Sequence, residues 1–226
     1  MAIKGLSTLA RRMVLFALAV CLAACAGRGR VHPTLTAMAD DPSALAVCDA
    51  LEELIAVGKD TPADREYAYE LVITHTRDTA GDTFARAAVT GRLVQQKGLL
   101  AANRVPDVER FALRSRELDP HFRNGAATRL LGTLYVTAPA TLLKHGDSEA
   151  GLELLEGLAD EYPDVPENHL RLAEAYITLS DPAPACPHLR RCLASKSALR
   201  PDDQALLNVL VTAAGPLRCP DAAATH

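Results

Sequence analysis

The sequence lacks tryptophan, and phenylalanine and tyrosine together supply only 4% of its residues. With so few aromatic side chains, the chain has little material for stacking platforms under bases or sugars. It also lacks an excess of basic residues, because its net charge is −4. Nucleic-acid binders normally carry a cluster of positive charge. We therefore expect no nucleic-acid partner.

Runs of β-branched residues and alternating strand patterns are also missing, whereas Ala and Leu are abundant. Apolar residues instead recur at intervals of three and four, which is the period of an amphipathic helix. The expected fold class is all-α, with about nine helices. Capping residues or a first-turn proline predict where helices begin. The predicted starts are Asp41-Pro42, Thr61-Pro62, Gly81-Asp82 (a helix running towards Leu100), Pro106-Asp107 and Pro201-Asp202.

No apolar run is long enough to span a bilayer, which requires about 20 residues. The longest run covers the 12 residues from Met13 to Ala24, behind the basic residues Lys4, Arg11 and Arg12. This arrangement is typical of a secretory signal peptide. We therefore expect residues 1–24 to be removed and exclude them from the fold.

Leu22-Ala23-Ala24-Cys25 resembles the lipobox of bacterial lipoproteins. The resemblance implies cleavage before Cys25, acylation of its thiol and new amine, and anchorage by several acyl chains. Ala26 resembles the following residue of lipoproteins that reach the outer membrane of Gram-negative bacteria. The expected location is the periplasmic face of that membrane, and an ordinary secretory signal with an incidental cysteine is the alternative. We expect residues 25–40 to form the lipidated N-terminus and tether, and residues 41–226 to form the helical domain.

Four further cysteines, Cys48, Cys186, Cys192 and Cys219, allow up to two disulfides in an oxidising periplasm. Cys186 and Cys192 are separated by about 240° around a helix, so they should not pair with each other. We expect Cys219 to pair with one of them, whereas Cys48 lies on an apolar helix face and can be a buried thiol. Cys186, His188, Cys192 and Cys219 could also provide zinc-type ligands, but their spacing is not that of a standard finger. We expect no metal.

Two stretches of the second half resemble each other, and both resemble the tetratricopeptide repeat. In "LLGTLY" and "RLAEAY", Gly132 aligns with Ala173 and Tyr135 aligns with Tyr176. Further along, Ala150 aligns with Ala185. In that family, small residues lie where the two helices of a hairpin cross, and larger ones fill the gap to the next hairpin. The resemblance implies an irregular solenoid of helical hairpins, clearest at residues 125–195, with a capping helix at about residues 201–214.

The two repeats are 41 residues apart, against 34 in the standard repeat. The surplus lies in segment 137–146, which contains the adjacent leucines Leu142 and Leu143. These leucines either cap the core or line a binding site for a ligand or partner. Tyr135 and Tyr176 are the other candidates for contact with a ligand or partner.

The block from Gly132 to Tyr176, together with the lipobox, resembles the lipoproteins known as T-components of TRAP transporters. The resemblance implies a periplasmic protein partner, such as a TRAP substrate-binding subunit, and an apolar small-molecule or lipid ligand. An assembly scaffold for outer-membrane, pilus or secretion machinery is the alternative function. A homo-oligomer is compatible with either function.

No metalloprotease helix, phosphate-binding loop, dinucleotide turn or nucleophile elbow is present in the sequence. We therefore expect no catalytic residue and no cofactor, with an active site outside these motifs as the remaining alternative. Arginines between residues 104 and 129 alternate with acidic residues. This pattern favours a solvated, salt-bridged helix face over a site for an anionic ligand. His75 and His169 fall within predicted helices and are interpreted as core or rim residues.

Overall fold

The computed structural model describes residues 29–40 and 43–215. The predicted signal peptide, Cys25 and Cys219 lie outside these ranges. Within them the chain is helical and forms no strand, which confirms the all-α class. Nine helices have ten residues or more in the described ranges, and α2 is a single turn. The helices are α2 (Pro33–Thr36), α3 (Ala44–Ala56), α4 (Pro62–Thr74), α5 (Ala80–Lys97), α6 (Val105–Leu118), α7 (Ala126–Thr137), α8 (Ser148–Glu161), α9 (Pro166–Thr178), α10 (Ala185–Ala194) and α11 (Pro201–Ala214), with 3₁₀ turns η1 (Gly98–Arg104), η2 (Ala140–Leu142) and η3 (Lys196–Ala198).

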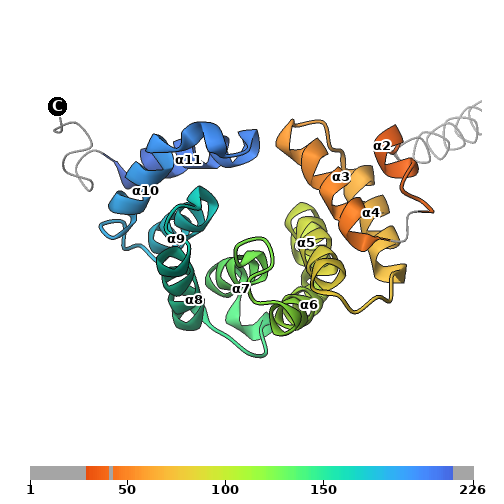
Figure 1. Cartoon of the computed structure of the whole chain (residues 1–226), viewed down its shortest axis with the longest axis horizontal. Coiled ribbons are helices and arrows are strands. Elements are labelled where there is room, and N and C mark those ends of the chain that lie inside the picture. Colours follow the sequence, from red (N-terminus) through yellow and green to blue (C-terminus); the bar gives the residue numbers. More distant parts are fainter. Residues whose placement is uncertain (1–28, 41–42, 216–226) are drawn as a thin grey trace, which may run out of the picture.

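The nine longer helices follow one another around an arc whose two ends turn back towards each other (Figure 1). Each odd-numbered helix from α3 to α9 packs on the even-numbered helix that follows it, and also on the next odd-numbered helix. The two ends of the arc meet, because α11 packs on α3. The odd-numbered helices therefore form one continuous row, which lies along the inner side of the arc (Figure 1).

Polar caps fix where several helices begin, although not always at the predicted residue. Thr61 and Asp64 form a capping box at α4, as the sequence predicts. The Ser43 side chain accepts from Ala46 N and starts α3 two residues after Pro42. Thr79, rather than Gly81, caps α5 by accepting from Asp82 N. A hydroxyl satisfies the free N–H groups of a first turn, whereas Gly offers no such side chain.

The predicted tether is shorter than expected, because α2 already belongs to the fold. Leu35 is fully buried and packs with the core of α3, α4 and α5. The His32 side chain caps α2, and the backbone N–H of His32 donates to Asp64 Oδ1 at 2.6 Å. Burial of one leucine and one hydrogen bond to Asp64 thus hold residues 32–36 on the first hairpin.

Helix hairpins in the second half cross closely where small residues meet. A Cβ on Gly132 would lie 2.9 Å from Gly151 O, and a Cβ on Gly151 would lie 2.8 Å from Gly132 O. The residue opposite Gly132 is therefore Gly151, one position beyond the Ala150 that the alignment predicts. In the next hairpin, Ala173 and Ala185 are both fully buried in the same cluster, as the repeat pattern predicts.

Candidate functional site

Tyr135 and Tyr176 lie on α7 and α9, and each packs against the helices on either side of its own. Tyr135, on α7, packs with residues of α6 and α8, and burial followed by the neighbouring Glu109 of α6 raises its pKa to about 12. Tyr176, on α9, packs with residues of α8 and α10, and its hydroxyl donates to Glu156 of α8. Each tyrosine thus contacts a glutamate on the preceding even-numbered helix. Tyr135 is only 4% exposed, so it cannot contact a partner directly.

The inserted segment 137–146 folds back over the core. Leu143 packs on the cluster around Tyr135, whereas Leu142 is partly buried and belongs to η2. Buried Glu109 accepts from the backbone N–H groups of Lys144 and His145 at 2.9 and 2.8 Å. The segment is therefore tied to α6, and Leu143 caps the core rather than lining a binding site.

The cysteines divide into two groups. Cys48 and Cys192 are buried free thiols, so neither is a disulfide partner in this structure. Cys48 packs in the core of the first hairpin, and the Cys192 thiol donates to Pro166 O at 3.4 Å. Burial comes first among the causes that raise the pKa of Cys192 to about 12. Cys186 is not among the free thiols. Since Cys219 lies outside the described residues, its pairing stays a prediction, now restricted to Cys186.

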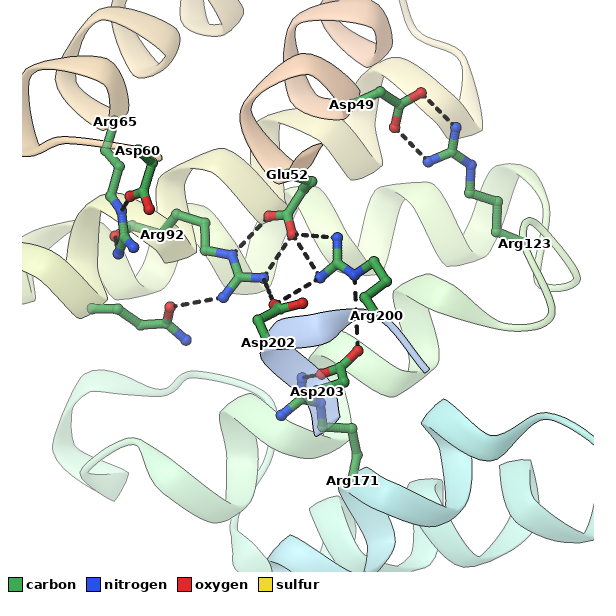
Figure 2. A network of polar contacts seen from close by, with 11 residues as sticks. Asp49, Glu52, Asp60, Arg65, Arg92, Arg123, Arg171, Arg200, Asp202 and Asp203 are labelled. Atoms are coloured by element: carbon green, nitrogen blue, oxygen red, sulfur yellow. Dashed lines mark hydrogen bonds and ion pairs between the residues drawn. The ribbon is translucent and has the colours of Figure 1, made fainter. Parts of the chain in front are cut away.

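A set of charged side chains gathers on the inside of the arc, where its two ends meet (Figure 2). We call this set the inner ion cluster, and it consists of Glu52 on α3, Arg92 on α5, Arg171 on α9, Arg200 directly before α11, and Asp202 and Asp203 on α11. Its members come from four odd-numbered helices and from the residue that caps α11. The cluster thus joins helices that are far apart in the sequence.

Glu52 lies at the centre of the cluster. Its carboxylate accepts two hydrogen bonds from Arg92, both 2.7 Å long, and two from Arg200, both 3.0 Å long. Arg200 also pairs with Asp202 at 3.1 Å. Burial raises the pKa of Glu52, but the hydrogen bonds and charges of the two arginines outweigh burial and leave it below its usual value. Glu52 is therefore ionised at neutral pH and holds both ends of the arc together.

A second pair extends the cluster towards α7 and α9. Arg171 pairs with Asp203 at 2.6 Å. Nearby, the Arg129 guanidinium donates to Asn168 Oδ1 at 2.6 Å but forms no ion pair with a carboxylate among the described residues. Burial lowers the pKa of Arg129, yet an arginine stays charged in a protein. Arg129 thus has no carboxylate within ion-pair distance, although the charges of Glu167 and Asp203 act on it from further away.

The predicted basic cluster is not one face. Arg104, Arg110 and Arg114 pair with acidic neighbours on or near their own helix, as expected of a solvated helix surface. Arg123 instead reaches across to α3 and pairs with Asp49 at 2.7 Å (Figure 2). Arg129 contacts Asn168 on α9 instead. Spacing along the chain could not separate these three environments.

Two histidines outside the cluster, His169 and His188, form a stacked pair. His169, on α9, is buried, as the sequence indicates, and its Nε2 contacts Pro163 O at 2.7 Å. Its Nδ1 lies 2.9 Å from His188 Nδ1. Since Nε2 of His169 donates to the carbonyl, its Nδ1 is placed to accept from Nδ1 of His188. Burial, then the neighbouring His169 and Arg191, lowers the pKa of His188.

Two hollows stand out on the described residues, with volumes of about 320 and 300 Å³. Charged residues such as Glu66, Glu70, Lys97 and Arg104 line the first. The second is lined by prolines and by polar residues that include Asp164, His169 and Arg191. No group of three or more metal-binding side chains lies together in residues 29–40 and 43–215. Neither hollow has the apolar lining typical of a lipid or small-molecule pocket.

None of the described helices combines the length and the apolar character needed to cross a bilayer. The chain matches no known family model, and no curated protein matches its sequence.

Proposed function

We propose that the chain is a lipid-anchored periplasmic binding protein built from tetratricopeptide-like hairpins. The main support is the similar packing of Tyr135 and Tyr176. Each lies on an odd-numbered helix and packs against the even-numbered helices before and after it. Small residues meet in both hairpins, at Gly132 with Gly151 and at Ala173 with Ala185, with the first pair shifted by one position from the alignment. Stacked hairpins of this kind create an extended curved surface suited to a protein segment.

The inner face of the arc is the proposed binding surface. It carries Arg129, which has no carboxylate partner in the described ranges. Two buried polar atoms in the same region, Asn168 Nδ2 and Asp202 Oδ1, form no hydrogen bond within the described residues. Buried polar groups normally have partners. Because these two atoms are buried, a carboxylate on a protein segment would pair with Arg129 rather than with them.

A protein partner is favoured over an apolar ligand. Charged and polar side chains contribute much of the lining of the two hollows described above. Leu143, a candidate for an apolar site, is partly buried and packs against the core. In the specific version that the family resemblance suggests, the partner is a TRAP-type substrate-binding subunit. The alternative partner is a component of an envelope assembly machine.

Crosslinking in intact cells followed by mass spectrometry tests this proposal. We compare the natural chain with Arg129→Ala, Arg129→Lys and the control Arg190→Ala, which changes an exposed arginine on α10. We expect one periplasmic protein to be recovered with the natural chain and with Arg190→Ala, and recovery to fall at least about tenfold with Arg129→Ala, since a charge-assisted hydrogen bond contributes roughly 1.5–3 kcal/mol. Arg129→Lys should restore part of it.

Equal recovery with Arg129→Ala, or no recovered protein with the natural chain, would contradict the proposal. The identity of the recovered protein separates the two versions. A substrate-binding subunit supports transport, and a secretion or pilus component supports assembly. Melting temperatures of the purified variants show whether a loss of recovery reflects unfolding instead.

A further inference from the structure

Two adjacent leucines project from the fold next to the N-terminal end of the described chain. Leu99 and Leu100, in η1, are 90% and 89% exposed. Val209 on α11 follows at 62% among the exposed large apolar residues of the described ranges. Adjacent exposed apolar side chains of this size are typical of a surface that meets an apolar environment.

The backbone path around these leucines directs them out of the fold. Gly98, with φ at +54°, ends α5 and turns the chain out of the helix, a conformation that other residues rarely adopt. On the other side, Ala101 and Val105 are only 4% and 3% exposed. The turn is therefore fixed to the core at both ends, and the leucines point outwards because of the backbone path.

The N-terminal anchor enters the fold at the same end of the first hairpins. A Cβ on Gly29 would lie 3.6 Å from Ala63 Cβ, in the first turn of α4. One turn further along α4, Glu66 pairs with Lys97 at 2.9 Å. Lys97 directly precedes the turn that carries the leucines. The entry point of the chain and the exposed leucines are thus linked through a few side-chain contacts.

The chain between the proposed lipid and this entry point is short. Only residues 26–28 separate Cys25 from Gly29. At roughly 3.5 Å per residue, the four steps from Cys25 to Gly29 span at most about 14 Å. A lipid on Cys25 would therefore keep the first hairpins close to the bilayer surface.

The surroundings suit the interface between water and lipid. The Arg104 guanidinium lies 5.4 Å from the centre of the Tyr69 ring, and both residues flank Leu100 in the same hollow. Tyrosine and the long basic side chains are favoured at the interface between water and lipid, because each has an apolar body and a polar tip. Lys97 and Arg104 already pair with acidic neighbours, so apolar insertion rather than net charge provides the attraction.

We propose that Leu99 and Leu100 insert into the same leaflet that holds the lipid on Cys25. This inference rests on the proposed lipid anchor. One acyl attachment leaves the domain free to rotate, whereas a second contact beside it is made at high effective concentration and fixes the orientation. The bilayer then holds α4 and α5 against its surface.

The absence of tryptophan makes a direct test available, because Leu99→Trp creates a protein with one tryptophan. The acylated full chain is reconstituted in vesicles of phosphatidylethanolamine and phosphatidylglycerol, with Val209→Trp as the matched control. We expect blue-shifted emission, protection from acrylamide and quenching by brominated acyl chains for Leu99→Trp alone. Water-exposed emission equal to that of Val209→Trp would overturn the proposal. Protection in native envelopes but not in protein-free vesicles would also overturn it and would indicate a protein partner.

The lipid anchor and the insertion can fail separately. The mass of the purified chain shows whether Cys25 carries acyl groups. The same two tryptophan variants, attached through an N-terminal histidine tag to nickel-chelating lipid, test insertion without natural acylation. If the purified natural chain carries no acyl groups but the tryptophan of Leu99→Trp is protected, the result supports insertion and refutes the anchor. If the chain is acylated but the tryptophan of Leu99→Trp is exposed to water, the result supports the anchor and refutes insertion.

Discussion

Neutralising Glu52 should loosen the contact between the two ends of the arc. Glu52→Gln keeps the size of the side chain but removes the charge that faces Arg92 and Arg200. The carboxylate accepts four hydrogen bonds from these arginines, and its side chain is 17% exposed. Arg92 and Arg200 would then remain with fewer neutralising contacts.

The expected loss follows from this partial burial. Breaking a fully buried ion pair costs about 3–5 kcal/mol, and an exposed pair contributes about 0–1 kcal/mol. Because Glu52 is mostly but not fully buried, we expect a loss of about 2–3 kcal/mol in the free energy of unfolding. For a domain of this size, that corresponds to a decrease in melting temperature of roughly 4–12 °C.

Asp49→Asn provides the matched control. Asp49 also forms two hydrogen bonds of 2.7 Å with one arginine, Arg123, but the two side chains are 48% and 44% exposed. We expect a loss below about 1 kcal/mol. Thermal and urea unfolding measure both losses, and small-angle X-ray scattering shows whether Glu52→Gln increases the radius of gyration. If Glu52→Gln costs no more than Asp49→Asn, the cluster does not hold the ends of the arc together.

Three further predictions concern other parts of the chain. Gly132→Ala should destabilise by about 2–4 kcal/mol in urea unfolding, since its Cβ would overlap the facing helix, whereas Gly157→Ala, which meets nothing within 4 Å, should be neutral or stabilising. Because the pKa of His188 is lower in the folded chain than in the unfolded chain, the unfolded chain is protonated at a higher pH, and stability should fall as pH drops below about 6.5. The melting temperature of His188→Gln should fall less over the same pH range. Thiol labelling of the denatured, unreduced protein should modify Cys48 and Cys192 but not Cys186.

Local sequence signals predict the helices well because capping and periodicity are local. Thr61-Pro62 and Pro201 mark the starts of α4 and α11 as observed. The predicted run of the third helix to Leu100 is wrong, because the backbone at Gly98 leaves the helical region at positive φ. Apolar spacing continued past this glycine, so the pattern alone made the exposed leucines look like a buried face.

The inner ion cluster could not be predicted from the sequence. Glu52 meets Arg92 and Arg200, which are 40 and 148 residues away, and no motif spacing links them. Asp202 and Asp203 have an ordinary local explanation, because acidic residues are favoured in the first turn of a helix. Only the curvature of the stacked hairpins brings that turn back to α3.

Helix packing and ion pairs therefore contribute differently to the closed arc. Small residues at the hairpin crossings, such as Gly132 against Gly151, set how closely each helix pair packs, and successive pairs add up to the bend. The bend brings α11 to α3, but the contact there is made largely by ion pairs rather than by a continuous apolar core. Ion pairs that are partly exposed exchange partners more readily than packed apolar groups do. The closed end of the arc is thus held mainly by the inner ion cluster.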